Sequence, residues 1–99
     1  MVAIEYTATD DLKFRLLQNN LWFREGNFVI SGATAKYGQD VSQNTTLIAG
    51  SAISFQDFNL GDLYFINSTA GQNTTVSFVG ILMTDDHMKD LGVSNEAGQ

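Results

Sequence analysis

The chain has 99 residues and a mass of 10.8 kDa, which is enough for one small domain. Eleven acidic and five basic residues give a net charge of −6, which argues against sequence-independent nucleic-acid binding. Without cysteine or proline, the composition excludes disulfide scaffolds, cysteine-ligated metals, cysteine nucleophiles and proline-rich recognition segments. We expect neither a leader nor a membrane segment, because the apolar runs are far shorter than the ~20 residues that cross a bilayer.

Apolar and polar residues alternate early in the chain, a pattern that indicates strands with one buried face. Residues 2–7 predict a first strand. Residues 12–17 predict a second, with a short helix capped by Thr9 as the alternative. Two apolar runs around Glu25–Asn27 predict a β-hairpin over residues 21–30, because short glycine-containing polar links commonly join paired strands.

The middle of the chain is less regular. Residues 31–40 are small and polar and predict a long loop. Residues 45–49 and 51–55 predict short strands interrupted at Gly50, where we expect a bulge. Residues 57–61 predict a turn.

The last third of the chain begins with residues 63–67, which are rich in strand formers. A turn is expected over residues 68–72, and residues 74–82 alternate again as a strand does. Residues 85–91 predict one or two helical turns. Residues 92–99 are polar, and we expect them to fray or to act as an arm.

Strands at roughly ten-residue spacing, with turn signals between them, are typical of an all-β fold. We therefore predict a small single-domain β-sandwich or barrel, jelly-roll-like, with one short helix as an option. The β domain is expected to span residues 1–83, and a polar C-terminal segment residues 84–99.

The sequence contains few side chains or motifs that could bind a metal or catalyse a reaction. The metal-capable side chains that gather in one place are Asp85, Asp86, His87 and Asp90, and their spacing does not match an EF-hand loop. A solvated acidic segment is the better interpretation, so we predict no metal and no other cofactor. Neither a nucleophile elbow nor a phosphate-binding glycine loop occurs, so we also predict that the protein is not an enzyme.

Aromatic side chains are the candidate contacts with a partner. We predict such contacts for Trp22, Phe23 and Tyr37, because interface centres are enriched in aromatic residues and depleted in charge, and only 16% of this chain is charged. A place in the core is the alternative for Trp22. If exposed, Trp22, Tyr37 and Tyr64 would instead form a stacking platform for sugars.

Two segments, Thr46–Ser54 and Val79–Leu82, resemble the small head-decoration (cement) proteins of tailed phages. The resemblance implies a short, mostly β structural protein of the virion that binds and stabilises the outside of a capsid shell. The implied partners are the major capsid protein and further copies of this chain, with a homotrimer favoured. A carbohydrate-binding β-sandwich module of a virion spike is the alternative function. Neither nucleic acid nor a membrane is an expected partner.

Overall fold

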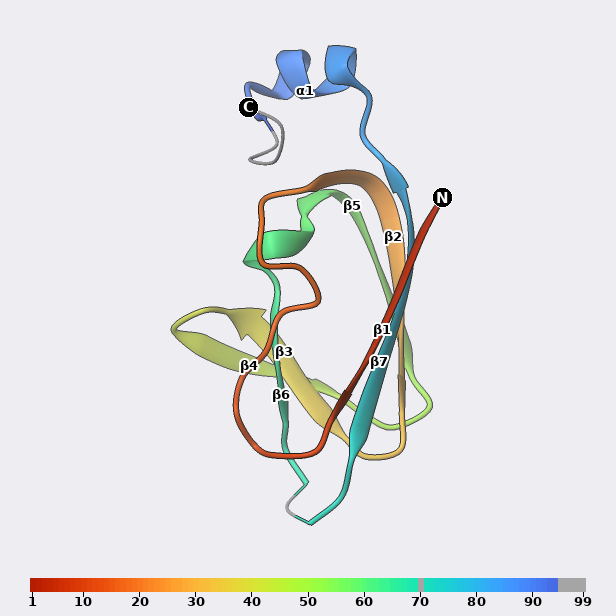
Figure 1. The fold of residues 1–99 in the computed structure, drawn as a ribbon, viewed down its shortest axis with the longest axis vertical. Coiled ribbons are helices and arrows are strands. Elements are labelled where there is room, and N and C mark those ends of the chain that lie inside the picture. The colour runs from red at the N-terminus through yellow and green to blue at the C-terminus, as the bar shows by residue number, and fades with distance from the viewer. Residues whose placement is uncertain (70, 95–99) are drawn as a thin grey trace.

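Two antiparallel sheets pack face to face in a computed structural model that describes residues 1–69 and 71–94 (Figure 1). The four-stranded sheet has the order β1 (Val2–Ala8), β7 (Thr74–Leu82), β2 (Trp22–Ser31) and β5 (Ala52–Asn59). The three-stranded sheet has the order β4 (Ser42–Leu47), β3 (Ala35–Gln39) and β6 (Tyr64–Asn67). A 3-10 turn, η1 (Leu60–Asp62), precedes β6, and the helix α1 (Asp85–Leu91) follows β7.

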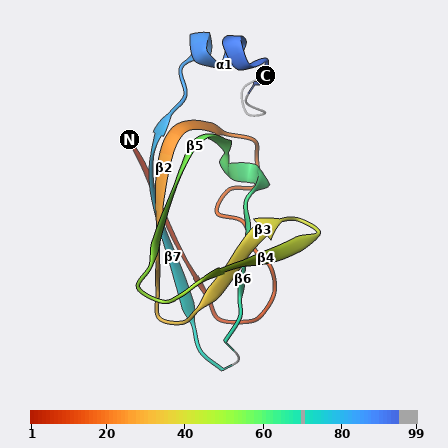
Figure 2. The same cartoon turned by 180° about the vertical axis from the view of Figure 1, so that it is seen from behind.

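The predicted β-sandwich with one short helix is confirmed, and the sandwich is not a closed barrel. Seen from behind in Figure 2, the long strands β2 and β7 lie on one side of the molecule, and the β3–β4 hairpin projects from the other. The helix α1 lies beyond one end of the two sheets (Figures 1 and 2).

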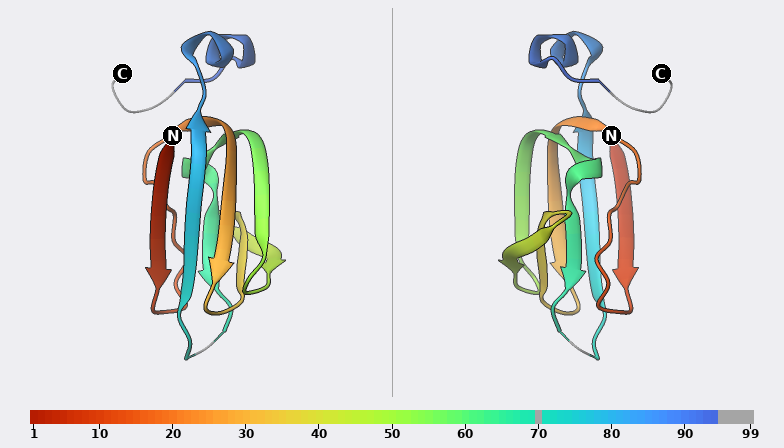
Figure 3. Two further views of the ribbon diagram at one scale, coloured as in Figure 1. Left: turned by 90° about the vertical axis from the view of Figure 1, so that its right-hand side faces the viewer. Right: turned by 90° about the vertical axis from the view of Figure 1, so that its left-hand side faces the viewer.

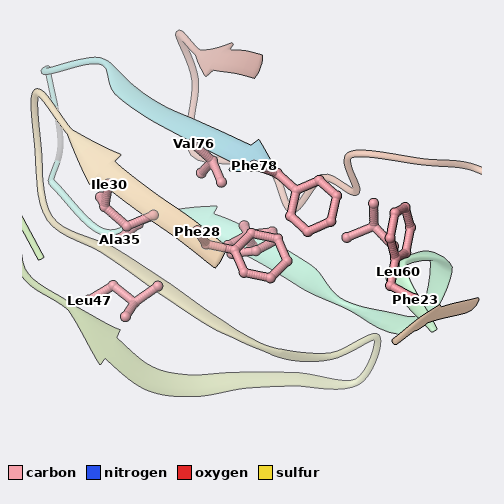
Figure 4. Close-up of a cluster of buried hydrophobic side chains, with 9 residues drawn as sticks. Phe23, Phe28, Ile30, Ala35, Leu47, Leu60, Val76 and Phe78 are labelled. Carbon is pink, nitrogen blue, oxygen red and sulfur yellow. The ribbon is translucent and has the colours of Figure 1, made fainter. Parts of the chain in front are cut away.

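The core lies between the sheets and is built by the alternation of β2 and β7. Phe28 and Ile30 of β2 are fully buried, as are Val76 and Phe78 of β7, and Phe28 is paired directly with Phe78. The rings of Phe28 and Phe78 have centroids 4.7 Å apart. Figure 4 shows the cluster, whose buried members are Phe23, Phe28, Ile30, Ala35, Leu47, Leu60, Phe65, Val76 and Phe78.

Two paired glycines leave open the space that these aromatic rings occupy. Gly26 of β2 is paired with Gly80 of β7, and both are buried. A Cβ atom at either position would overlap the ring of Phe78; at Gly26 it would also meet Phe58, and at Gly80 it would meet Phe23. The aromatic side chains therefore pack directly against bare backbone at the centre of the four-stranded sheet.

The hairpin predicted over residues 21–30 is wrong, because β2 runs through that region as one strand. Its central glycine, Gly26, lies between Gly80 of β7 and Phe55 of β5 and forms no turn. The polar residues on either side of Gly26 point to the outside of the sheet, where they are exposed. Glycine is needed here for close packing rather than for reversal of the chain.

The strand predicted over residues 12–17 is also wrong, and neither does a helix form there. This segment makes a single bridge to the three-stranded sheet, in which Phe14 and Phe65 exchange two backbone hydrogen bonds of 2.8 Å each. The ring of Phe14 packs on Tyr6 of β1, with centroids 4.6 Å apart. The segment thus covers the side of the sandwich between β1 and β6.

The middle of the chain needs two further corrections. Residues 31–40 are not one long loop, because β3 occupies their second half. Gly50 is not a bulge within one sheet: it lies between β4 and β5, which belong to different sheets, and its φ of 90° suits a glycine in a tight connection.

The turn predicted over residues 57–61 begins later than expected, because β5 continues to Asn59 before η1. The predicted strand over residues 63–67 is confirmed as β6, the strand over 74–82 as β7, and the helical turns over 85–91 as α1. Residue 70 of the predicted turn at 68–72 lies outside the described residues, as do residues 95–99 of the predicted polar arm. The boundary between residues 1–83 and 84–99 stays a prediction.

We expect Gly26→Ala to lower the free energy of unfolding by about 1–3 kcal/mol, because the added methyl group overlaps the rings of Phe78 and Phe58. Urea unfolding measures the change. Ala52→Val is the matched control, because it adds methyl groups on the exposed side of the same sheet and should change stability by less than about 0.5 kcal/mol. A Gly26→Ala protein as stable as the unaltered chain would contradict this role.

Candidate binding surfaces

The exposed side of the four-stranded sheet, here called the outer face, is the broadest regular surface of the described residues. In the left view of Figure 3 it faces the reader, with β1, β7, β2 and β5 side by side. Strand register places on it the side chains that alternate with the core: Ala3, Glu5, Thr7, Glu25, Asn27, Val29, Ala52, Ser54, Gln56, Thr75, Ser77, Val79 and Ile81. This set contains two glutamates, and the exposed Arg24 lies beside Glu25 where the register of β2 shifts.

Several polar side chains of the outer face pair with one another across the strands. The Thr7 and Thr75 hydroxyls are 2.9 Å apart, and one donates to the other. The Ser77 hydroxyl donates to a Glu5 carboxylate oxygen at 3.0 Å. The Ser54 hydroxyl donates to the amide oxygen of Asn27 at 2.9 Å. These groups therefore already have partners before any other molecule covers the face.

Aliphatic side chains fill the spaces between these polar pairs. Val29, Val79 and Ile81 are 40%, 42% and 43% exposed, respectively. Val79 and Ile81 border a shallow, open hollow at the α1 end of the face, which Met1 and Gln56 also line. Exposed β-branched side chains on a flat sheet offer apolar area without a loop that must be ordered first.

A second hollow lies around Tyr64, on the side of the sandwich between β1 and β6. Because the neighbouring residue Phe65 points into the core, Tyr64 points to the outside of β6. Two cations lie over its ring: the Nζ atom of Lys13 is 5.5 Å from the ring centroid, and the Cζ atom of Arg15 is 5.1 Å from it. This Tyr64 hollow is lined by Tyr6, Lys13, Phe14, Arg15, Gln18, Asp40 and Tyr64.

The two cations of the Tyr64 hollow differ in their partners. Lys13 forms an ion pair with the carboxylate of Asp40. Arg15 donates instead to the backbone oxygen of Gly61 at 3.0 Å and to the amide oxygen of Gln18 at 3.1 Å. Within the described residues, no carboxylate lies within ion-pair distance of Arg15.

The α1 end of the sandwich holds an aspartate–histidine pair. An Asp57 carboxylate oxygen lies 2.9 Å from Nε2 of His87 and so links β5 to α1. Asp57 adopts a φ of 49°, a left-handed backbone conformation that is unusual for a residue with a side chain. The metal-capable set around Asp85 and Asp86 does not converge, and the described residues contain no group of three or more such ligands.

The three predicted contact residues lie in different surroundings. Phe23 is fully buried in the core, and Tyr37 is half-buried with its ring against Phe55 and Phe65. Trp22 is half-buried at the start of β2. Their contact with a partner stays a prediction, but the structure gives Phe23 and Tyr37 a place in the packing between the sheets.

The stacking platform of three aromatic rings is not assembled. Tyr37 points into the sandwich and Tyr64 points out of it, so the two lie on opposite sides of the three-stranded sheet. Trp22 belongs to the other sheet. Lys13 and Arg15 were not predicted as neighbours of Tyr64. Their alternation with Phe14 places them on the outside only because Phe14 joins β6, and that pairing is not visible in the local sequence.

Comparison with protein-family models, with curated proteins and with solved structures finds no match. In the part of the chain that the structure describes, no helix has the length and apolar character needed to cross a membrane. The function therefore has to be inferred from the surfaces of the sandwich.

We expect Tyr37→Ala to lower the free energy of unfolding by about 2 kcal/mol, because its ring fills space beside Phe55 and Phe65. Tyr37→Phe keeps the ring and should keep the stability. Urea unfolding of both variants measures this difference. Unchanged stability in Tyr37→Ala, with loss of binding to a partner, would show that this side chain is a contact residue and not a core residue.

Proposed function

We propose that this protein is a non-enzymatic structural protein of a virion, which binds and stabilises a capsid surface through the outer face of its four-stranded sheet. The observation that carries the proposal is the combination, on one flat face, of exposed aliphatic side chains with polar groups that are already paired. Burying such a face gains apolar contact and leaves the paired polar groups satisfied. The resemblance of Thr46–Ser54 and Val79–Leu82 to phage head-decoration proteins supports the same role.

Charge defines the kind of surface that suits this face. The outer face carries Glu5 and Glu25, with one arginine, Arg24, beside Glu25 at its α1 end, and the whole chain has a net charge of −6. An apolar capsid surface with lysine or arginine at its rim would complement it. Each contact is small, but a capsid repeats its surface many times, and an oligomer that binds several sites at once gains affinity from high effective concentration.

A homo-oligomer, with a trimer favoured, is part of this proposal. Within the described chain, β1 and β5 end the four-stranded sheet, and each pairs with a neighbouring strand on one side only. Such edges can add a strand from another molecule. The mass of the purified protein in solution tests this part: three times the chain mass supports it, and a strict monomer counts against it.

We expect Val79→Lys to weaken binding to capsid shells that lack this protein by at least tenfold, because it places a charge at the centre of the outer face. Co-sedimentation with such shells measures binding, and their heat resistance measures stabilisation. Val41→Lys is the matched control, since Val41 is 90% exposed between β3 and β4, away from this face. Urea unfolding of both variants confirms that each is folded.

The proposal is wrong if the unaltered protein neither binds the shells nor raises their resistance to heat. Equal losses of binding in Val79→Lys and Val41→Lys would remove the outer face as the docking surface. Raised salt should weaken the interaction, because charge complementarity is screened.

A further inference from the structure

We propose that the Tyr64 hollow binds a saccharide ring that carries one carboxylate. This site lies on the side of the sandwich between β1 and β6, away from the outer face, and the inference does not depend on the proposed capsid binding. The right view of Figure 3 shows this side of the molecule, where the segment after β1 runs beside β6. Three kinds of group lie together in this open depression: the guanidinium of Arg15, exposed aromatic rings, and the side-chain amide of Gln18.

Arg15 is the group that would receive the carboxylate. Its guanidinium is held by two hydrogen bonds, to Gly61 and Gln18, and by the ring of Tyr64, so its orientation is set in the free protein. A guanidinium has five N–H donors, and these two bonds leave donors for a ligand. Among the described residues no carboxylate neutralises it, although the chain has more than twice as many acidic as basic residues.

Aromatic side chains in the hollow fit the apolar face of a sugar ring. Tyr6 is 45% exposed, and its ring packs on Phe14 with centroids 4.6 Å apart. Both rings line the same hollow as Arg15. Carbon–hydrogen groups of a pyranose can pack on such rings while its polar edges reach Arg15 and Gln18.

Acidic groups nearby favour a sugar over a ligand with many negative charges. Asp40 lines the Tyr64 hollow, and a neighbouring recess that shares Tyr64 and Asp40 also contains Asp62 and Gln39. These carboxylates can accept hydrogen bonds from hydroxyl groups, but they repel phosphate chains and acidic peptides. A ligand with one carboxylate and several hydroxyl groups matches this arrangement. Arg15 has no carboxylate partner among the described residues, and two aspartates, Asp40 and Asp62, lie nearby.

The test is a titration of the purified protein, followed by NMR, with glucuronate and N-acetylneuraminate, and with glucose and acetate as controls. We expect saturable shifts with at least one acidic sugar, centred on Arg15, Gln18 and Tyr64, and at least tenfold weaker binding of glucose and of acetate. Arg15→Gln should weaken binding of the acidic sugar at least tenfold. Arg24→Gln is the matched control, because it removes an exposed arginine beside Asp57 and His87, and it should keep the affinity within twofold.

Three results would overturn the inference. Acetate that binds as tightly as the acidic sugars would reveal a site for anions alone, and glucose that binds as tightly would remove the role of Arg15. Absence of saturation with both acidic sugars would mean that the hollow is not a sugar site. If Arg15→Gln does not fold, the comparison of the four ligands on the unaltered protein decides, and capsid binding through the outer face is unaffected by either outcome.

Discussion

The whole sandwich depends on the contact between aromatic rings and glycine backbone at the centre of the four-stranded sheet. Phe78 lies against the facing pair Gly26 and Gly80, and Phe23 and Phe58 pack beside it. Because no Cβ atoms separate these rings from the backbone, the core is filled by few, large side chains. The polar and small residues that alternate with this core along the same strands point to the opposite side, where the outer face forms.

Period-two alternation predicted the sandwich class and the strand β7, in which Val76 and Phe78 recur on the buried side. The prediction from alternation failed where one residue type can serve two structural roles. Glycine flanked by polar residues is typical of a turn, yet Gly26 serves the packing of Phe78. Nothing local to residues 21–30 distinguishes these two uses, because the ring that requires the glycine comes from a strand more than 50 residues later.

The candidate sites were harder to predict than the fold, for a related reason. Residues 63–66 form an apolar run, and only strand pairing decides that Phe65 points inward and Tyr64 outward. The bridge between Phe14 and Phe65 then brings Arg15 beside Tyr64 across 49 positions of sequence. Aromatic content suggested Trp22, Phe23 and Tyr37 as contacts, but composition does not distinguish an aromatic residue of the core from one at the surface.

The attachment of α1 to the sandwich can be followed by spectroscopy of the unlabelled protein. His87 is the single histidine of the chain, and it meets Asp57 at the point where α1 reaches β5. Trp22, the single tryptophan, accepts a hydrogen bond at its backbone oxygen from Met83 immediately before the helix. An imidazole resonance that is free of overlap from a second histidine therefore reports on the contact between α1 and β5, and it can follow detachment of the helix in solution without any label.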